Sequence, residues 1–173
     1  MKLLKILFVL LLVILVVVFI FLLINDNEKI KLVECIDGDT ARFIINNKEE
    51  KVRFIGIDTP ESTNFQEEYG IEASNYTCEL LRNAENIYIE YDMNSSVRDK
   101  YNRVLGWVFV DDNNISELLL SKGYAEVKYI YDDYKYINNL CEVQKVAYSN
   151  KLGIWSIHSY NYADNYCSKY IYK

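Results

Sequence analysis

Two carboxylates directly follow a segment of strand-forming residues, and their spacing is the first feature that points to chemistry. The segment Val52–Ile57 is rich in β-branched and aromatic residues; Asp58 follows at once, and Glu61 comes three positions later. A second acidic motif, IDGDT at positions 36–40, precedes another strand-like segment, Thr40–Ile45. Aspartate and glycine form turns for purely local reasons, so this second motif alone indicates only a turn.

The two motifs acquire a common meaning if their strands are antiparallel neighbours. The start of Thr40–Ile45 then lies beside the end of Lys51–Ile57, which brings Asp39 close to Asp58. Neighbouring carboxylates repel each other and shift each other's pKa unless a cation lies between them. Hard divalent ions prefer carboxylate, carbonyl and water oxygens. We therefore expect a metal site formed by Asp39, Asp58 and the backbone carbonyl of Thr59, completed by water or a substrate phosphate.

Two arginines complete a set of side chains suited to phosphodiester hydrolysis. Arg53 lies on the strand that ends at Asp58, and Arg103 comes just before the strand-like segment Val104–Val110. The planar guanidinium group can contact two phosphate oxygens at once and stabilise the charge that develops on them. Glu61 could orient or deprotonate an attacking water. One arginine alone would indicate only a solvated surface charge, whereas the combination favours hydrolysis.

The apolar pattern and the turn signals predict five strands and three helices. The predicted strands are Lys31–Cys35, Thr40–Ile45, Lys51–Ile57, Asn86–Tyr91 and Val104–Val110, and the predicted helices are Glu72–Asn83, Ile115–Lys122 and Tyr136–Asn150. Residues 125–131 are expected to be extended, Asn114 is a predicted helix N-cap, and Gly123 is a predicted helix terminator. This order is typical of an α+β or mainly β protein, a five-stranded OB-fold barrel with three packed helices.

An apolar segment precedes this predicted domain. Residues 6–24 are nineteen consecutive apolar residues, with Lys2 and Lys5 before them, and this length suffices for a transmembrane helix. Residues 1–25 are expected to be a retained membrane anchor; a cleaved signal peptide, which would yield a secreted protein, is the alternative. The two lysines place the N-terminus in the cytoplasm and the domain outside the cell membrane. We expect a linker at 26–31, the domain at 32–156, and a tyrosine-rich tail at 157–173.

The charge balance restricts how this chain could bind nucleic acid. The whole chain has a formal net charge of −6, with 19 basic and 25 acidic side chains, and residues 1–25 hold two of the lysines and none of the acids. The outer part is therefore more acidic than the whole, whereas nucleic-acid-binding domains are usually basic. A polyanion would have to be held at a local site or through a bound metal.

Four cysteines also bear on the location of the protein. Cys35, Cys78, Cys141 and Cys167 show no CxxC spacing and accompany a single histidine, which argues against a zinc site. Disulfides form outside the cytoplasm, and the sequence leaves three pairings open. A bridge between Cys141 and Cys167 is the favoured one because it would hold the tail.

Six motifs together resemble the staphylococcal nuclease (thermonuclease) family. They are IDGDT (36–40), VRFIGIDTPES (52–62), YGIEAS (69–74), DKYNRVLGWVFV (99–110), LLLSKGYAEVKYIY (118–131) and LGIWS (152–156). The resemblance spans roughly residues 32–156 and implies an OB-fold barrel with three helices. It further implies a Ca²⁺-dependent phosphodiesterase that cuts DNA and RNA, prefers single strands and leaves 3′-phosphate ends.

The resemblance also implies roles for ten residues. By position in the motifs these are Asp39, Asp58 and Thr59 for calcium, Arg53, Glu61 and Arg103 for catalysis, and Lys100, Tyr101, Tyr129 and Tyr131 for the substrate. At position 102 the chain has asparagine where the family usually has glycine, and asparagine tolerates the left-handed conformation. The loop 62–68 is acidic, which predicts weaker nonspecific attraction to nucleic acid.

Two other functions compete with a membrane-anchored nuclease. One is an OB-fold module displayed at the membrane that binds nucleic acid but has lost catalysis, and the other is an adhesion or structural protein. The presence of all five polar residues Asp39, Arg53, Asp58, Glu61 and Arg103 favours the enzyme, because a module without catalytic duty has no physical need for them together. No protein partner is indicated, and we expect a monomer.

Overall fold

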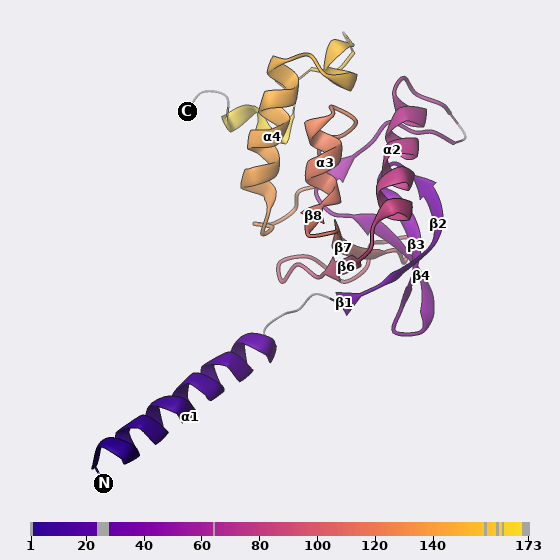
Figure 1. The fold of residues 1–173 in the computed structure, drawn as a ribbon. Coiled ribbons are helices and arrows are strands. Elements are labelled where there is room, and N and C mark those ends of the chain that lie inside the picture. The colour runs from indigo at the N-terminus through magenta and orange to yellow at the C-terminus, as the bar shows by residue number, and fades with distance from the viewer. Residues whose placement is uncertain are drawn as a thin grey trace.

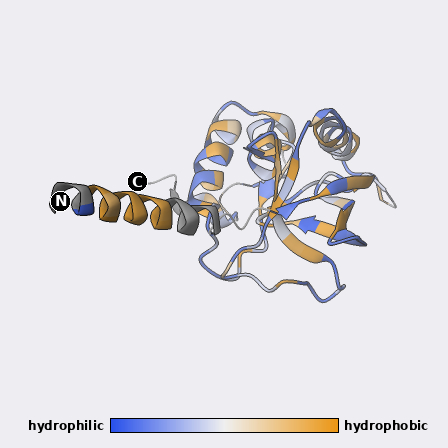
Figure 2. Ribbon diagram, turned by 60° about the horizontal axis from the view of Figure 1, so that its bottom comes forward, coloured by the Kyte–Doolittle hydropathy of each residue, from blue (hydrophilic) through white to orange (hydrophobic). Residues whose placement is uncertain are grey.

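The structure, a computed structural model, describes residues 2–23, 28–63, 65–157, 159–161, 163 and 165–170. Its first element is helix α1 (Lys2–Leu23), of which side chains are described for Lys5 and for residues 7–17. The eleven apolar side chains from Leu7 to Val17 are exposed, and this part of α1 is apolar throughout, whereas the later helices alternate apolar and polar residues (Figure 2). Among the residues that the structure describes, no helix has both the length and the apolar character that crossing a membrane requires.

The following domain is built around a mixed sheet of seven strands. Its strands are β1 (Glu28–Lys29), β2 (Lys31–Asp37), β3 (Thr40–Ile45), β4 (Lys48–Phe54), β6 (Ile87–Glu90), β7 (Val104–Val110) and β8 (Asn113–Asn114). The strand order is β1-β6-β7-β4-β3-β2, with β8 beside β7. The β4–β7 pair is parallel and the other pairs are antiparallel.

The predicted five-stranded barrel is only partly correct, because the sheet is not closed. Strands β1 and β2 occupy opposite ends of the strand order, yet only Ile30 separates them along the chain. The sheet therefore curls until its two edges share one stretch of backbone, and Ile30 donates a hydrogen bond to the carbonyl of Ile87. The sheet is therefore curved like a barrel, but its edge strands β1 and β2 are not hydrogen-bonded to each other as paired strands.

The predicted strand Lys51–Ile57 is wrong in one respect that matters for the site. The strand ends at Phe54, and Gly56 has a φ of 79°, which lies in the left-handed region. The chain then leaves the sheet and forms a separate pair, in which β5 (Ile57–Asp58) is antiparallel to β9 (Glu126–Val127). Asp58 consequently sits on a two-stranded ribbon beside the sheet rather than on the sheet itself.

The three predicted helices of the domain are confirmed. They are α2 (Gly70–Asn83), α3 (Ile115–Ser121) and α4 (Ile137–Ser149), followed by the 3₁₀ turns η1 (Gly153–Ser156) and η3 (Tyr166–Tyr170). Helix α3 lies between α2 and α4 (Figure 1). The side chain of Asn114 caps α3 by accepting a hydrogen bond from the Ser116 N–H, and Gly123 follows the helix with a φ of 68°, as predicted.

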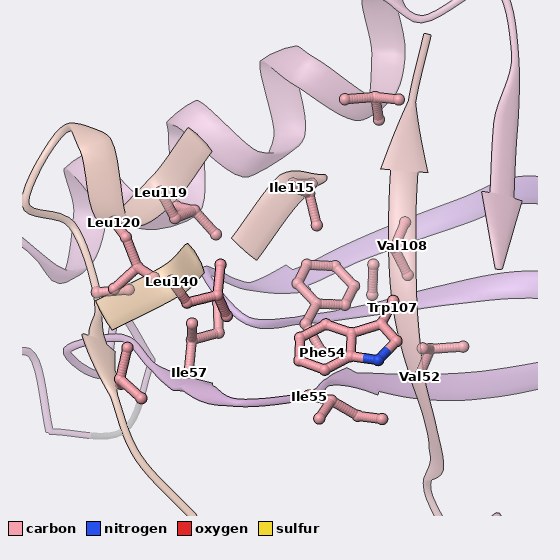
Figure 3. Packing of buried hydrophobic residues seen from close by; sticks show 14 of the residues in the cluster. Val52, Phe54, Ile55, Ile57, Trp107, Val108, Ile115, Leu119, Leu120 and Leu140 are labelled. Carbon is pink, nitrogen blue, oxygen red and sulfur yellow. The ribbon is translucent and has the colours of Figure 1, made fainter. Parts of the chain in front are cut away.

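One hydrophobic core joins the sheet to the helices. Figure 3 shows Phe54 and Trp107 of the sheet close to side chains from α3 and α4. The largest fully buried side chains are Trp107, Phe43, Phe54, Ile57, Leu81, Ile89, Ile115, Leu119, Leu120, Leu140 and Ile154. Burial of an apolar side chain of this size stabilises a fold by about 1.5–3 kcal/mol, so this core fixes the strand ends that carry the polar residues of the site.

Two disulfides tie the outer elements to this core. Cys141 of α4 is bonded to Cys167 of η3, which confirms the favoured pairing, and Cys35 of β2 is bonded to Cys78 of α2. Both cysteines of the Cys141–Cys167 bridge are fully buried. The bridge therefore holds the described part of the tail against α4.

The double variant Cys141→Ala, Cys167→Ala should lose about 3 kcal/mol of unfolding free energy. The expected loss follows from the loop of 26 residues that the bridge closes. Urea unfolding followed by tryptophan fluorescence measures it, with the reduced wild-type chain as a second reference. An unchanged urea midpoint would show that the bridge contributes nothing to the fold.

Candidate active site

Arg53 lies between Asp39 and Asp58 at the centre of the candidate site. Its Nη2 is 2.9 Å from Asp39 Oδ2 and 2.8 Å from Asp58 Oδ1. Its Nη1 donates to the carbonyl of Ile57 at 2.8 Å. The register of β3 and β4 pairs Thr40 with Arg53, which places Asp39 at the end of the strand that carries the arginine. The structure thus brings the two predicted metal carboxylates together through the guanidinium group.

The carboxylate of Asp39 is buried, and each of its two oxygens accepts a hydrogen bond. Its Oδ1 accepts a hydrogen bond from Thr40 Oγ1 at 2.8 Å, and its Oδ2 accepts one from the Thr59 N–H at 3.1 Å. Burial raises the pKa of Asp39, and Arg53 and these two hydrogen bonds offset the rise only in part. The ionised carboxylate would therefore gain from a further positive charge.

Glycine at position 38 is required by the contact between this turn and Thr59. A Cβ atom on Gly38 would lie 2.7 Å from Thr59 Oγ1 and 2.9 Å from its Cβ. Thr77 of α2 donates a hydrogen bond to the Gly38 carbonyl, and the Cys35–Cys78 bridge joins the same two elements. Helix α2 thereby holds the IDGDT turn in place.

Glu61 lies in the loop after β5, close to a carboxylate that sequence reasoning missed. Asp37 accepts hydrogen bonds from Ser62 Oγ at 2.7 Å and from the Gly38 N–H at 2.8 Å. Burial raises the pKa of Glu61; a hydrogen bond with Asp37 and the negative charges of Asp37, Asp39 and Asp58 raise it further. Asp37 belongs to the IDGDT motif, and its position two residues before Asp39 is the sequence feature that could have indicated its place in the site.

The loop of Glu61 is held by its own backbone contacts. The Glu61 N–H donates to Glu67 Oε2 and the Glu67 N–H donates to the Glu61 carbonyl, both at 2.9 Å. The same carbonyl packs on Gly70, where a Cβ atom would lie only 2.2 Å away. This close approach explains why α2 begins at a glycine, two residues before its predicted start.

The residues present fit an oxygen-coordinated cation. No group of three or more His, Cys, Asp or Glu side chains forms a complete metal site within the described ranges. However, oxygens of Asp39 and Asp58 both lie within hydrogen-bond distance of one nitrogen of Arg53, so one cation can contact both. Beside them, Thr59 Oγ1 is buried and has no hydrogen-bond partner among the described residues. Oxygen donors of this kind suit calcium or magnesium.

Arg103 lies in a second loop, together with Lys100 and Tyr101. Asp99 orders this loop, since its Oδ1 accepts the backbone N–H groups of Tyr101 and Arg103 and its Oδ2 accepts Arg103 Nε at 2.6 Å. The exposed Tyr101 ring is 5.4 Å from the Arg103 guanidinium and 5.0 Å from Lys100 Nζ. Asn102 has a φ of 63°, so it adopts the left-handed conformation that was expected of it.

The parallel pairing of β4 and β7 brings the chain segments that carry the two arginines side by side. Arg53 is paired with Leu105, and Val52 with Val104. Arg103 therefore falls two residues before the partner of Arg53. Arg103 itself precedes β7, and each arginine contacts a carboxylate, since Arg53 contacts Asp39 and Asp58 and Arg103 contacts Asp99.

Tyr129 covers the Arg53 guanidinium from the outside. Its ring centre is 5.7 Å from the guanidinium and 5.7 Å from Lys128 Nζ. Its φ of 59° is uncommon for a bulky residue and costs energy, as is often found at functional sites. Tyr131 is more exposed than Tyr129, with 81% of its surface accessible.

Lys128 is a second cation that sequence reasoning missed. Its Nζ is 3.0 Å from Asp58 Oδ2 and 2.9 Å from Glu126 Oε1. Partial burial lowers the pKa of Lys128, but the hydrogen bonds and charges of Glu126 and Asp58 raise it overall. Each carboxylate oxygen of Asp58 thus contacts a cationic side chain, because Oδ1 contacts Arg53 and Oδ2 contacts Lys128. A lysine in a tyrosine-rich, mixed-charge segment gives no sequence signal for this role.

Comparisons with known proteins agree with this arrangement. A family model described as "Staphylococcal nuclease homologue" matches residues 51–157. The chain is 38% identical over 146 residues to Endonuclease YncB of Bacillus subtilis (strain 168), covering 81% of this chain and 68% of that protein. It is 35% identical over 136 residues to the Thermonuclease of Staphylococcus hyicus, covering 76% of this chain and 79% of that protein.

A third relative extends well beyond the matched region. The SPbeta prophage-derived endonuclease YokF of Bacillus subtilis (strain 168) is 37% identical over 135 residues, which cover 76% of this chain but only 45% of that protein. The shared part is therefore less than half of that relative.

Proposed function

The chain belongs to the staphylococcal nuclease family and is a nuclease, and we propose that it is a Ca²⁺-dependent phosphodiesterase that cuts DNA and RNA. The proposal includes a preference for single strands and products with 3′-phosphate ends. The observation that supports it most is the convergence of Asp39, Arg53 and Asp58 beside Glu61. The alternative, a nucleic-acid-binding module without catalysis displayed at the membrane, leaves this convergence unexplained, because carboxylates repel the phosphates that such a module must bind.

The proposed mechanism assigns one task to each residue of the site. Asp39, Asp58 and the Thr59 carbonyl would hold a calcium ion, which when bound would supply positive charge to a phosphate oxygen and to a water. Glu61 would orient an attacking water and accept its proton, a task for which a raised carboxyl pKa is well suited. The bond from phosphorus to the 5′-oxygen would break, and the departing 5′-oxygen would take a proton from solvent. Arg53 and Arg103 bind the phosphate and stabilise its developing charge.

The exposed cationic and aromatic side chains near the site are the proposed contacts to the substrate. Lys100 and Tyr101 lie beside Arg103, where a terminal phosphate of the substrate would bind. Tyr129 and Tyr131 offer exposed rings on which bases can stack. Stacking requires an unpaired base with an accessible face, which supports a preference for single strands.

Replacement of Arg53 by lysine should lower the rate of DNA hydrolysis by about 100-fold or more. Lysine carries a single point charge and cannot contact both carboxylates and the phosphate at once, and loss of one stabilising donor typically costs about 100- to 1,000-fold. The assay measures kcat on heat-denatured DNA. Arg42→Lys is the matched control, because Arg42 lies on the adjacent strand β3 and pairs only at the surface with Glu34.

Circular dichroism of both variants would separate loss of fold from loss of activity. A folded Arg53→Lys variant that turns over DNA at a near-normal rate would contradict the assigned role.

We also propose that residues 1–25 anchor a monomeric chain in the cell membrane, with the nuclease domain outside. The run of nineteen apolar residues and the exposed side chains from Leu7 to Val17 support the anchor. The two disulfides support an oxidising location.

The test of this anchor is fractionation of expressing bacteria with protease added to intact cells. Full-length protein in the membrane fraction, cleaved by external protease, is expected; a shortened chain in the medium would instead indicate a secreted protein.

A further inference from the structure

The tail of the chain forms one wall of a groove next to the candidate active site. This groove has a volume of about 670 Å³. Its lining includes Asp58, Thr59, Glu67 and the segment 126–131. The rest of the lining, called the tail wall below, consists of the tail residues Ser159, Tyr160, Asn161, Asn165 and Tyr166. The match to the family model ends at residue 157, so this wall lies beyond the matched region.

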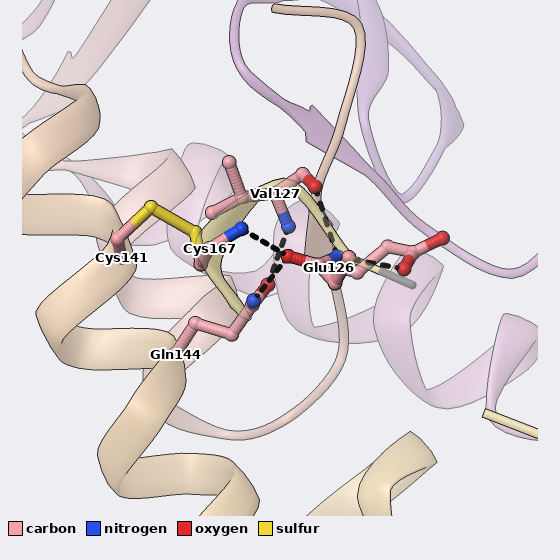
Figure 4. The surroundings of a disulfide bond; sticks show 6 residues. Glu126, Val127, Cys141, Gln144 and Cys167 are labelled. Carbon is pink, nitrogen blue, oxygen red and sulfur yellow. Dashed lines mark hydrogen bonds between the residues drawn. A yellow bond between two sulfur atoms is a disulfide. The ribbon is translucent and has the colours of Figure 1, made fainter. Parts of the chain in front are cut away.

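Asn165 fixes the tail to β9, the strand that pairs with β5. Figure 4 shows the partners of Asn165, which are Glu126, Val127, Gln144 and Cys167. Its Oδ1 accepts hydrogen bonds from Gln144 Nε2 at 2.7 Å and from the Cys167 N–H at 2.9 Å. Its Nδ2 donates to the Val127 carbonyl and to Glu126 Oε2, both at 3.0 Å. Because Glu126 is paired with Asp58 across the β5–β9 ribbon, these contacts link the tail to the strand that carries Asp58.

Three of the four charged side chains that line the groove pair with one another. Glu126 contacts Lys128 through one oxygen and Asn165 through the other, and Lys128 also contacts Asp58. Such paired charges offer little attraction to a phosphate. The fourth, Glu67, is negative and repels phosphate. The rest of the lining includes the rings of Tyr131 and Tyr166, of which Tyr166 is 37% accessible, and the amides of Asn161 and Asn165. A planar, uncharged ligand with hydrogen-bonding edges fits this chemistry.

We propose that the tail extends the base-stacking surface of Tyr129 and Tyr131, so that Tyr166 contacts a base of a single-stranded substrate in this groove. The phosphates of that strand would stay at Arg53 and Arg103. This inference rests on the proposed function, since it assigns part of the same substrate to the tail. It adds Tyr166 to the residues that contact the substrate.

The test compares two strands that differ only in their bases. One is a single-stranded decamer of thymidylate, and the other is an abasic strand of equal length. In the full-length chain, Tyr166→Leu keeps apolar bulk but removes the stacking surface. The KM for the thymidylate strand should rise about tenfold, as expected for one base stacked on an aromatic ring, with kcat and the KM for the abasic strand unchanged. Tyr166→Phe keeps the ring and should retain the wild-type KM.

Tyr148→Leu is the matched control. Tyr148 is 39% accessible and lies on α4 but is not among the residues that line the groove, so its replacement should change neither KM. An unchanged KM of Tyr166→Leu on thymidylate, or an equal rise on both strands, would overturn the proposal.

Failure of the proposed function remains distinguishable from failure of the base contact at Tyr166. If the wild-type chain cuts neither strand in calcium, the proposed function fails, and fluorescence anisotropy with labelled thymidylate decamer then tests the groove alone. A Kd that rises about tenfold in Tyr166→Leu supports this contact, whereas equal Kd values for wild type and variant, or no binding by either, overturn it.

Discussion

The guanidinium group of Arg53, held between two carboxylates, is the interaction on which the rest of the site depends. Asp39 and Asp58 come from different ribbons, one at the turn before β3 and the other on β5, and they share Nη2 of this arginine. Asp39 and Arg53 are both buried, so neither charge can turn to solvent if its partner is removed. Breaking such a pair typically costs about 3–5 kcal/mol, which makes the geometry of the site inseparable from the stability of its fold.

The fold supplies the constraints that keep this arrangement in place. The curled sheet aligns Thr40 with Arg53, and the turn at Gly56 directs Asp58 onto the ribbon with β9. Helix α2 holds the IDGDT turn through Thr77, and the tail holds β9 through Asn165. Each disulfide strengthens one of these supports, because one joins β2 to α2 and the other joins α4 to the tail.

The sequence was sufficient to predict features that depend on local chemistry or on neighbouring strands. The cap at Asn114 and the left-handed conformation of Asn102 follow such rules. The Cys141–Cys167 bridge was one of three open pairings and was favoured because it would hold the tail. Features that depend on distant contacts were missed or wrong. The open sheet results from strands whose ends meet only in three dimensions, and the break after Phe54 follows from the pairing of β5 with β9. Lys128 enters the site through that same ribbon, so no local pattern could have identified it.

The most direct test of the account is hydrolysis of heat-denatured DNA by the purified full-length chain in detergent. The rate is measured in calcium and again after a chelator is added, beside the double variant Asp39→Ala, Glu61→Gln. The account predicts cutting that needs calcium, stops with the chelator and is absent from the variant, while the variant keeps the circular dichroism of a folded domain. Cutting that persists in the chelator, or a well-folded chain that cuts at no calcium concentration, would contradict it.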